Sequence, residues 1–145
     1  MKDLPHRYMA SARSVASAEN VSLESPGLTG FESAGPAEFD GPGTLWSPET
    51  LVPVAVADCF ILSFRAVAAA SRFEWLEIAC EVTGVLDKAD RAMRFTEFQL
   101  RATLQVAAAV DEARALRVLE KAERVCLISN SLIADVHATF EVVRR

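Results

Sequence analysis

The sequence has few of the residues from which common functional sites are built. Its 145 residues include only two histidines and three cysteines, and lysines and arginines form no cluster. Three cysteines do not make the disulfide framework of a small secreted domain, and the distant His6 and His137 argue against a histidine-ligated metal site. A net charge of −5 without a basic cluster argues against a nucleic-acid partner. We therefore expect no metal, no cofactor and no nucleic acid.

Several catalytic signatures are also absent. The chain has no glycine-rich phosphate loop, no Cys-x-x-Cys and no Gly-x-Ser-x-Gly. Its first seven residues contain no apolar segment of the kind found in signal peptides, so we expect a cytoplasmic protein with reduced thiols. Hydrophobic residues make up 51% of the chain, which is enough for one compact domain over residues 1–145.

One apolar segment has the length of a membrane span. Residues 51–70 number 20 but include Pro53, Asp58 and Arg65. An ionised residue near the middle of a span costs roughly 2.5–3.5 kcal/mol on insertion. We therefore expect a helix that is buried by protein and no membrane partner.

The remaining patterns predict an α+β fold. Ser47 and Pro48 are typical of a helix start, although Pro53 predicts a bend. Period-two alternation in residues 76–86 and 94–104 predicts an antiparallel hairpin with its turn at residues 87–90. The predicted elements are strands and a Pro/Gly-rich loop (1–47), a buried helix (48–71), the hairpin (76–104), an amphipathic helix (110–126) and a last strand (135–143).

Cysteine is the remaining candidate for chemistry. Cys80 lies on the apolar face of a predicted strand, where a free thiol most often acts as a small hydrophobic residue, and we assign it no role. Cys59 lies in the buried helix and Cys126 ends the amphipathic helix. If the two helices pack together, these thiols could meet at disulfide distance, but spacing alone does not establish it.

Two segments resemble the OsmC/Ohr family, whose members include organic hydroperoxide resistance proteins. The first is residues 47–51, Ser-Pro-Glu-Thr-Leu, followed by residues 57–60, Ala-Asp-Cys-Phe. The second is residues 121–130, Lys-Ala-Glu-Arg-Val-Cys-Leu-Ile-Ser-Asn. The predicted hairpin between them falls where the family has its own hairpin, so the resemblance covers nearly the whole chain.

The resemblance implies a fold, an activity and partners. The fold is an intertwined homodimer in which antiparallel sheets surround two long buried helices. The activity is a thiol-dependent peroxidase that reduces organic hydroperoxides in oxidative stress defence. Cys59 would become a sulfenic acid and condense with Cys126 to a disulfide, which a dithiol such as a lipoylated protein would reduce. Glu49 matches the carboxylate that orients a catalytic arginine.

The arginine itself is missing at the family position. The family's Gly-Gly-Arg-Asp-Gly turn falls on residues 16–20, which places Ala18 where the arginine would be. Arg13 is the nearest substitute in sequence, whereas Arg65 lies about 240° around the helix from Cys59. Asp58 also occupies a position where a small residue is usual, and a nearby negative charge disfavours a thiolate.

These departures keep a second hypothesis open. A divergent member without peroxidase turnover would bind an apolar small molecule at the dimer interface, and its cysteines would only pack. In that case Asp58 has a structural role, pairing with Arg65 or with a cation of the partner chain.

Overall fold

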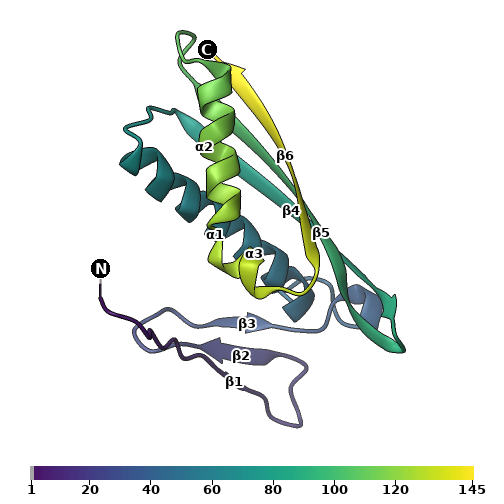
Figure 1. Ribbon diagram of the computed structural model, residues 1–145. Helices are drawn as coiled ribbons and strands as arrows, with labels where there is room; N and C mark the ends of the chain where they lie inside the picture. The colour runs from purple at the N-terminus through teal and green to yellow at the C-terminus, as the bar shows by residue number, and fades with distance from the viewer. Residues whose placement is uncertain (1) are drawn as a thin grey trace. The chain divides into compact units, whose positions relative to one another are not determined.

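The computed structural model describes residues 2–145 and divides into two compact units, Met1–Leu51 and Val52–Arg145 (Figure 1). Met1 itself lies outside the described residues. The boundary falls in the first turns of helix α1 (Pro48–Ala70), which continues without interruption through Pro53. Both units contain a three-stranded sheet, and together with the helices they confirm an α+β fold.

The N-terminal unit is a small antiparallel sheet followed by a loop. Strands β1 (Ser11–Arg13), β2 (Val21–Glu24) and β3 (Phe31–Ser33) pair in the order β1–β2–β3. A short 3₁₀ helix, η1 (Ala37–Phe39), follows within the Pro/Gly-rich loop. The fold requires a glycine at position 41, because a Cβ there would lie 1.8 Å from the carbonyl oxygen of Gly35.

The first strand is short. Strands are predicted within residues 1–47, but β1 pairs only three residues with β2. A turn closes directly after it, where the Ala18 N–H donates to the Val15 carbonyl at 3.0 Å. Weak alternation and small side chains offer little apolar surface to extend the strand further.

The larger unit is built on a mixed sheet. Strands β4 (Glu77–Ala89), β5 (Ala92–Val106) and β6 (Asp135–Arg144) pair in the order β4–β5–β6. The antiparallel hairpin of β4 and β5 is confirmed, with a bulge between Val85 and Leu86. Its turn is centred two residues later than predicted, at Asp90 and Arg91, which both have positive φ as tight two-residue hairpin turns require.

The last strand runs parallel to its neighbour, so the expectation of purely antiparallel sheets is wrong here. β6 pairs with β5 in parallel register, Leu100 facing Ala138. A parallel pair needs a long crossover, and helices α2 (Glu112–Arg124) and α3 (Leu127–Ser131) supply it. α2 begins after Asp111, whose carboxylate accepts a hydrogen bond from the Ala113 N–H at 3.2 Å.

One face of this sheet packs against the helices and forms the core. The apolar positions of all three strands lie against α1 and α2, and aromatic rings fill the space between the layers. Phe60 of α1 stacks on Phe140 of β6 with ring centroids 5.9 Å apart. Phe64 meets Phe73 and Trp75 edge to face, at 6.5 and 5.4 Å. The opposite face of the sheet carries polar residues.

Helix α1 is only partly covered. Val56, Phe60 and Phe64 are fully buried, but Val54 is 41% and Leu62 is 53% exposed. Complete burial of this helix, which its composition predicts, is therefore not reached within one chain. The helix keeps an apolar face without a partner in the described residues.

We predict that Phe64→Ala lowers the free energy of unfolding by about 3–5 kcal/mol, because it leaves a cavity between two aromatic rings. Met93, which is 67% exposed near the hairpin turn, is the matched control, and Met93→Ala should change it by less than about 0.5 kcal/mol. Denaturant titration at one protein concentration measures both. Equal effects of the two substitutions would contradict this description of the core.

Candidate active site

Two of the predicted site residues come from elements that pack together. Cys59 is half-buried on α1, and Cys126 is 1% exposed and immediately precedes α3. The predicted helix over residues 110–126 is therefore too long. The chain leaves the helix at Val125, whose N–H still bonds to the Lys121 carbonyl, and Cys126 takes an extended conformation that begins α3.

Helix α3 contacts both sulfur atoms. The Ser129 hydroxyl donates to Cys126 Sγ at 3.2 Å, and the Ile128 N–H donates to Cys59 Sγ at 3.5 Å. The thiols of Cys59 and Cys126 lie near enough to influence each other's ionisation, and both are free. A single turn of helix therefore lies against two reduced thiols.

Burial disfavours the thiolate of Cys126, and hydrogen bonds from Ser129 partly offset this effect. Burial raises the pKa of the Cys126 thiol above its ordinary value of 9.0, while the hydroxyl and the N–H of Ser129 act in the opposite direction. The neighbouring Cys59 raises this pKa further, through a hydrogen bond and through its charge. The two thiols are thus electrostatically linked, and a change at one changes the other.

The third cysteine, Cys80, is less reactive because it lies on the core side of the sheet. Cys80 lies in β4 opposite Ala102, on the core side of the sheet. Burial, followed by the charges of Cys126 and Glu81, raises the pKa of Cys80 to about 12. Because the thiolate is the reactive form, Cys80 is nearly inert at neutral pH.

Glu49 lies in the first turn of α1 at a well-capped helix start. The Ser47 N–H donates to Thr50 Oγ1 at 2.9 Å, and the Thr50 N–H donates to Ser47 Oγ at 3.3 Å. Glu49 is half-buried, and its Oε2 is buried with no hydrogen-bond partner among residues 2–145. A buried carboxylate oxygen without a donor is costly, so this side chain is suited to a cationic partner.

The cations and the aspartate considered from the sequence are all on the surface. Arg13 is an exposed residue of β1 in the N-terminal unit. Asp58 and Arg65 are both exposed on α1, and within residues 52–145 no ion pair joins them.

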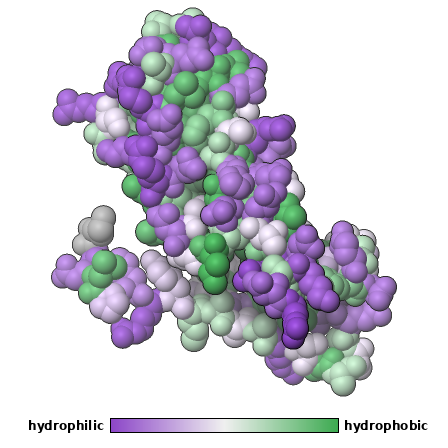
Figure 2. Space-filling model, turned by 45° about the vertical axis from the view of Figure 1, so that its right-hand side comes forward, coloured by the Kyte–Doolittle hydropathy of each residue, from purple (hydrophilic) through white to green (hydrophobic). Residues whose placement is uncertain are grey.

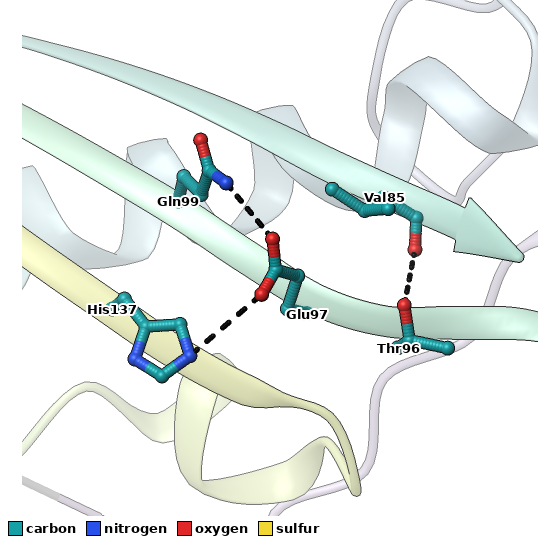
Figure 3. A network of polar contacts seen from close by, with 5 residues as sticks. All are labelled: Val85, Thr96, Glu97, Gln99 and His137. Carbon is teal, nitrogen blue, oxygen red and sulfur yellow. Dashed lines mark hydrogen bonds and ion pairs between the residues drawn. The ribbon is translucent and has the colours of Figure 1, made fainter.

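The polar residues of the sheet form a separate group on its outer face. Glu97 lies between Gln99 and His137, with Gln99 Nε2 at 2.8 Å and His137 Nε2 at 3.9 Å (Figure 3). A groove of about 470 Å³ runs beside them and is lined by both Gln99 and His137. Cys80 lies on the opposite face of the same sheet. Residues 2–145 contain no group of three or more metal-ligating side chains placed to hold an ion.

Periodicity located the two thiols on different elements, and the structure brings them together. Periodicity did not identify Ser129 or Ile128. Neither a hydroxyl in a short helical turn nor a backbone N–H has a sequence pattern that assigns it to a sulfur atom. The spacing of three residues between Cys126 and Ser129 was the available signal, since residues three apart lie on the same side of a helical turn.

Comparison with known proteins identifies the family of this chain. The family model for OsmC-like proteins matches residues 41–141. The protein YmaD of Bacillus subtilis is 27% identical over 109 residues, which cover 73% of each chain. An OsmC-like protein from Vibrio cholerae has a similar structure at 16% identity, with a TM-score of 0.84 over 94% of this chain and 99% of that one.

A second similar structure is that of a protein named after its role in hydroperoxide resistance. An organic hydroperoxide resistance protein from Elizabethkingia anophelis is 21% identical and has a TM-score of 0.76, with both chains fully covered. At these identities the structural matches show the fold, whereas the family model covers well over half of the chain. This chain belongs to the OsmC-like family.

Proposed function

We propose that this protein is a thiol-dependent peroxidase that reduces organic hydroperoxides through Cys59 and Cys126. The observation that carries the proposal is that two free thiols, Cys59 and Cys126, both accept hydrogen bonds from adjacent residues of α3. The family and the name of the Elizabethkingia anophelis structure supply the substrate class. The cycle starts from free thiols, so we place it in the cytoplasm.

The cycle has three balanced steps. The thiolate of Cys59 attacks one oxygen of the hydroperoxide, the O–O bond breaks, and the alkoxide leaves as an alcohol after taking a proton. The thiolate of Cys126 then attacks the sulfur of the Cys59 sulfenic acid, forming the disulfide and releasing water. An external dithiol, such as a lipoyl group, reduces the disulfide and is itself oxidised.

Glu49 supports the proposal through its unsatisfied oxygen. A guanidinium would give Oε2 the donor that it lacks among the described residues, and a bidentate arginine–carboxylate pair is the strongest such arrangement. We propose that an arginine docks on Glu49 and assists peroxide cleavage. Arg13 is the candidate in this chain, although Ala18 occupies the family position.

The surroundings of Cys59 suit a substrate with an alkyl group. Phe60 and Val56 are its buried neighbours on α1, and the partly buried Ile61 packs on the same core. An apolar hydroperoxide gains from leaving water at such a site, whereas hydrogen peroxide does not. We therefore expect organic hydroperoxides to be preferred.

We predict that cumene hydroperoxide with a dithiol consumes reducing equivalents and that Cys59→Ser abolishes this, because the attacking sulfur is gone. Spectrophotometric assay of dithiol oxidation measures it, and Cys80→Ser is the matched thiol control that should keep activity. If hydroperoxide leaves Cys59 and Cys126 free and titratable, the peroxidase proposal fails and apolar ligand binding takes its place.

The structure also predicts which thiols form the disulfide. A pKa of about 12 leaves Cys80 with about a thousandfold less thiolate at neutral pH than a thiol with the ordinary value of 9.0. Peptide mapping by mass spectrometry after one equivalent of hydroperoxide should find Cys59 joined to Cys126 and Cys80 reduced. A disulfide that contains Cys80 would contradict this assignment.

We propose that a second copy of this chain covers the exposed face of α1. By length and composition alone this helix could also cross a membrane. Asp58 and Arg65 are both exposed on it, however, and two ionised residues are costly in lipid. From Val52 to Ala70 the other exposed residues of this helix are apolar: Val54, Ala55, Leu62, Ala66, Ala69 and Ala70. Figure 2 shows that hydrophobic residues are exposed in several places on one face of the protein.

Charge favours a second chain that runs in the opposite direction. Asp58 and Arg65 are seven residues apart, two turns of helix, and so lie on nearly the same side of α1. Two such faces packed antiparallel present each aspartate to the other chain's arginine, with Leu62 between them. This arrangement would give Asp58 the structural role that its position beside Cys59 otherwise leaves unexplained.

We predict that the protein has twice the chain mass of 15.8 kDa in solution and that Leu62→Glu shifts it toward the monomer. An unpaired carboxylate at the centre of an apolar interface is strongly unfavourable. Light scattering after size-exclusion chromatography measures the mass. Thr83→Glu, exposed on the outer face of the sheet, is the control and should leave it unchanged. A monomeric wild-type protein at micromolar concentration would contradict the proposal.

A further inference from the structure

We propose that Ser129 is a positioning residue for the proposed peroxidase cycle, whose hydroxyl holds the sulfur of Cys126 in the form and orientation that attack Cys59. The inference rests on the proposed function for its role in turnover. Its physical basis, a hydroxyl bonded to one particular sulfur, can be tested without any turnover.

The polar side chains of α3 have different partners. Asn130 Nδ2 donates to the Arg124 carbonyl at 3.1 Å, and Ser131 Oγ donates to the Leu127 carbonyl at 2.7 Å. Both are ordinary bonds to backbone oxygens near a helix end. Ser129 differs, because it is half-buried and its hydroxyl donates to Cys126 Sγ at 3.2 Å. Among the three polar side chains of α3, only that of Ser129 donates to a sulfur atom.

The chemistry of disulfide formation needs a donor at this sulfur. Cys126 is 1% exposed, so its thiolate has little contact with water and must be stabilised by the protein. The Ser129 hydroxyl and N–H both favour the charged form. When the thiolate attacks the Cys59 sulfenic acid, the S–S bond forms, the S–O bond breaks, and hydroxide leaves as water. A hydrogen bond that increases the thiolate population accelerates this step.

Hydrogen bonding also lowers the intrinsic nucleophilicity of the sulfur, but less than it increases the thiolate population. Nucleophilicity changes with a Brønsted coefficient of about 0.4–0.5, so a tenfold gain in thiolate gives about a threefold gain in rate while the thiol is mostly protonated. Because burial keeps the pKa of Cys126 above its ordinary value, this condition holds at neutral pH. The net effect of Ser129 is therefore acceleration.

The same turn of helix fixes the other partner. The Ile128 N–H donates to Cys59 Sγ at 3.5 Å, one residue before Ser129. α3 thus holds both sulfurs from adjacent positions. When a dithiol reduces the disulfide, its sulfur bonds to Cys59, the Cys59–Cys126 bond breaks, and the electron pair goes to Cys126. Ser129 stabilises that leaving thiolate and so directs attack to Cys59.

The first test measures the thiolate of Cys126 alone. In a Cys59→Ser, Cys80→Ser background, far-ultraviolet thiolate absorbance is followed against pH for four proteins: the background itself and the same protein with Ser129→Ala, Ser129→Thr or Ser131→Ala. Ser129→Ala should move the curve to higher pH, and Ser129→Thr, which keeps a hydroxyl, should restore it. Ser131→Ala removes a hydroxyl from the same helix that touches no sulfur, and it should leave the curve unchanged.

The second test measures the step itself. With all three cysteines present, Ser129→Ala should slow the loss of the Cys59 sulfenic acid, trapped by dimedone, by about threefold or more at pH 7. Circular dichroism checks folding, and Ser129→Gly, which lacks the same hydroxyl, is the second variant if Ser129→Ala is unfolded.

The two proposals fail separately. Superimposable titration curves for the background protein and its Ser129→Ala variant overturn the inference, whatever the peroxidase activity. Absence of hydroperoxide-dependent turnover in the wild type overturns the proposed function, while a shifted titration curve would still establish the bond between Ser129 and Cys126.

Discussion

The burial of Cys126 against Cys59 is the contact on which the candidate site depends. It requires α1, α3 and the core side of the sheet to be in place together, because Cys126 belongs to the core cluster and Cys59 packs on its edge. Burial alone would make Cys126 a poor nucleophile, since it raises the pKa of the thiol. The donors of α3 partly offset that effect, so the proposed chemistry of the pair depends on this single turn of helix.

Helix α1, in contrast, has two features that lack a partner within the described residues of one chain. α1 contributes Phe60 and Phe64 to the core but leaves Leu62 exposed on its other side. At its start, Glu49 has a buried oxygen without a partner among residues 2–145. Exposed apolar surface and an unsatisfied carboxylate are both unfavourable in isolation. We interpret both as features that contact a partner molecule, and the second chain of the proposed homodimer would be that partner.

The sequence predicted the elements better than their arrangement. Alternation identified the strands of the hairpin, and Ser47 and Pro48 marked the start of α1. Alternation carries no strand direction, however, so nothing in residues 135–143 distinguished a parallel β6 from an antiparallel one. Cys59 and Cys126 could be selected from composition and resemblance, but their meeting depends on packing between elements. The bond from Ser129 depends on a rotamer, and the orphaned oxygen of Glu49 depends on burial, and neither has a signature in sequence.

The parallel pairing of β5 and β6 has a consequence for how this protein folds. Val106 and Arg144, at the ends of the paired register, are separated by the whole crossover of α2 and α3, so that loop must close before the last strand gains its ladder. Contacts between residues distant along the chain form slowly, since their entropy is lost before their energy is gained. Cys126 lies inside this late-closing segment, whereas Cys59 lies before it. In a nascent chain Cys59 and Cys126 therefore stay apart until this segment packs on α1, so the proposed redox cycle would require completed folding.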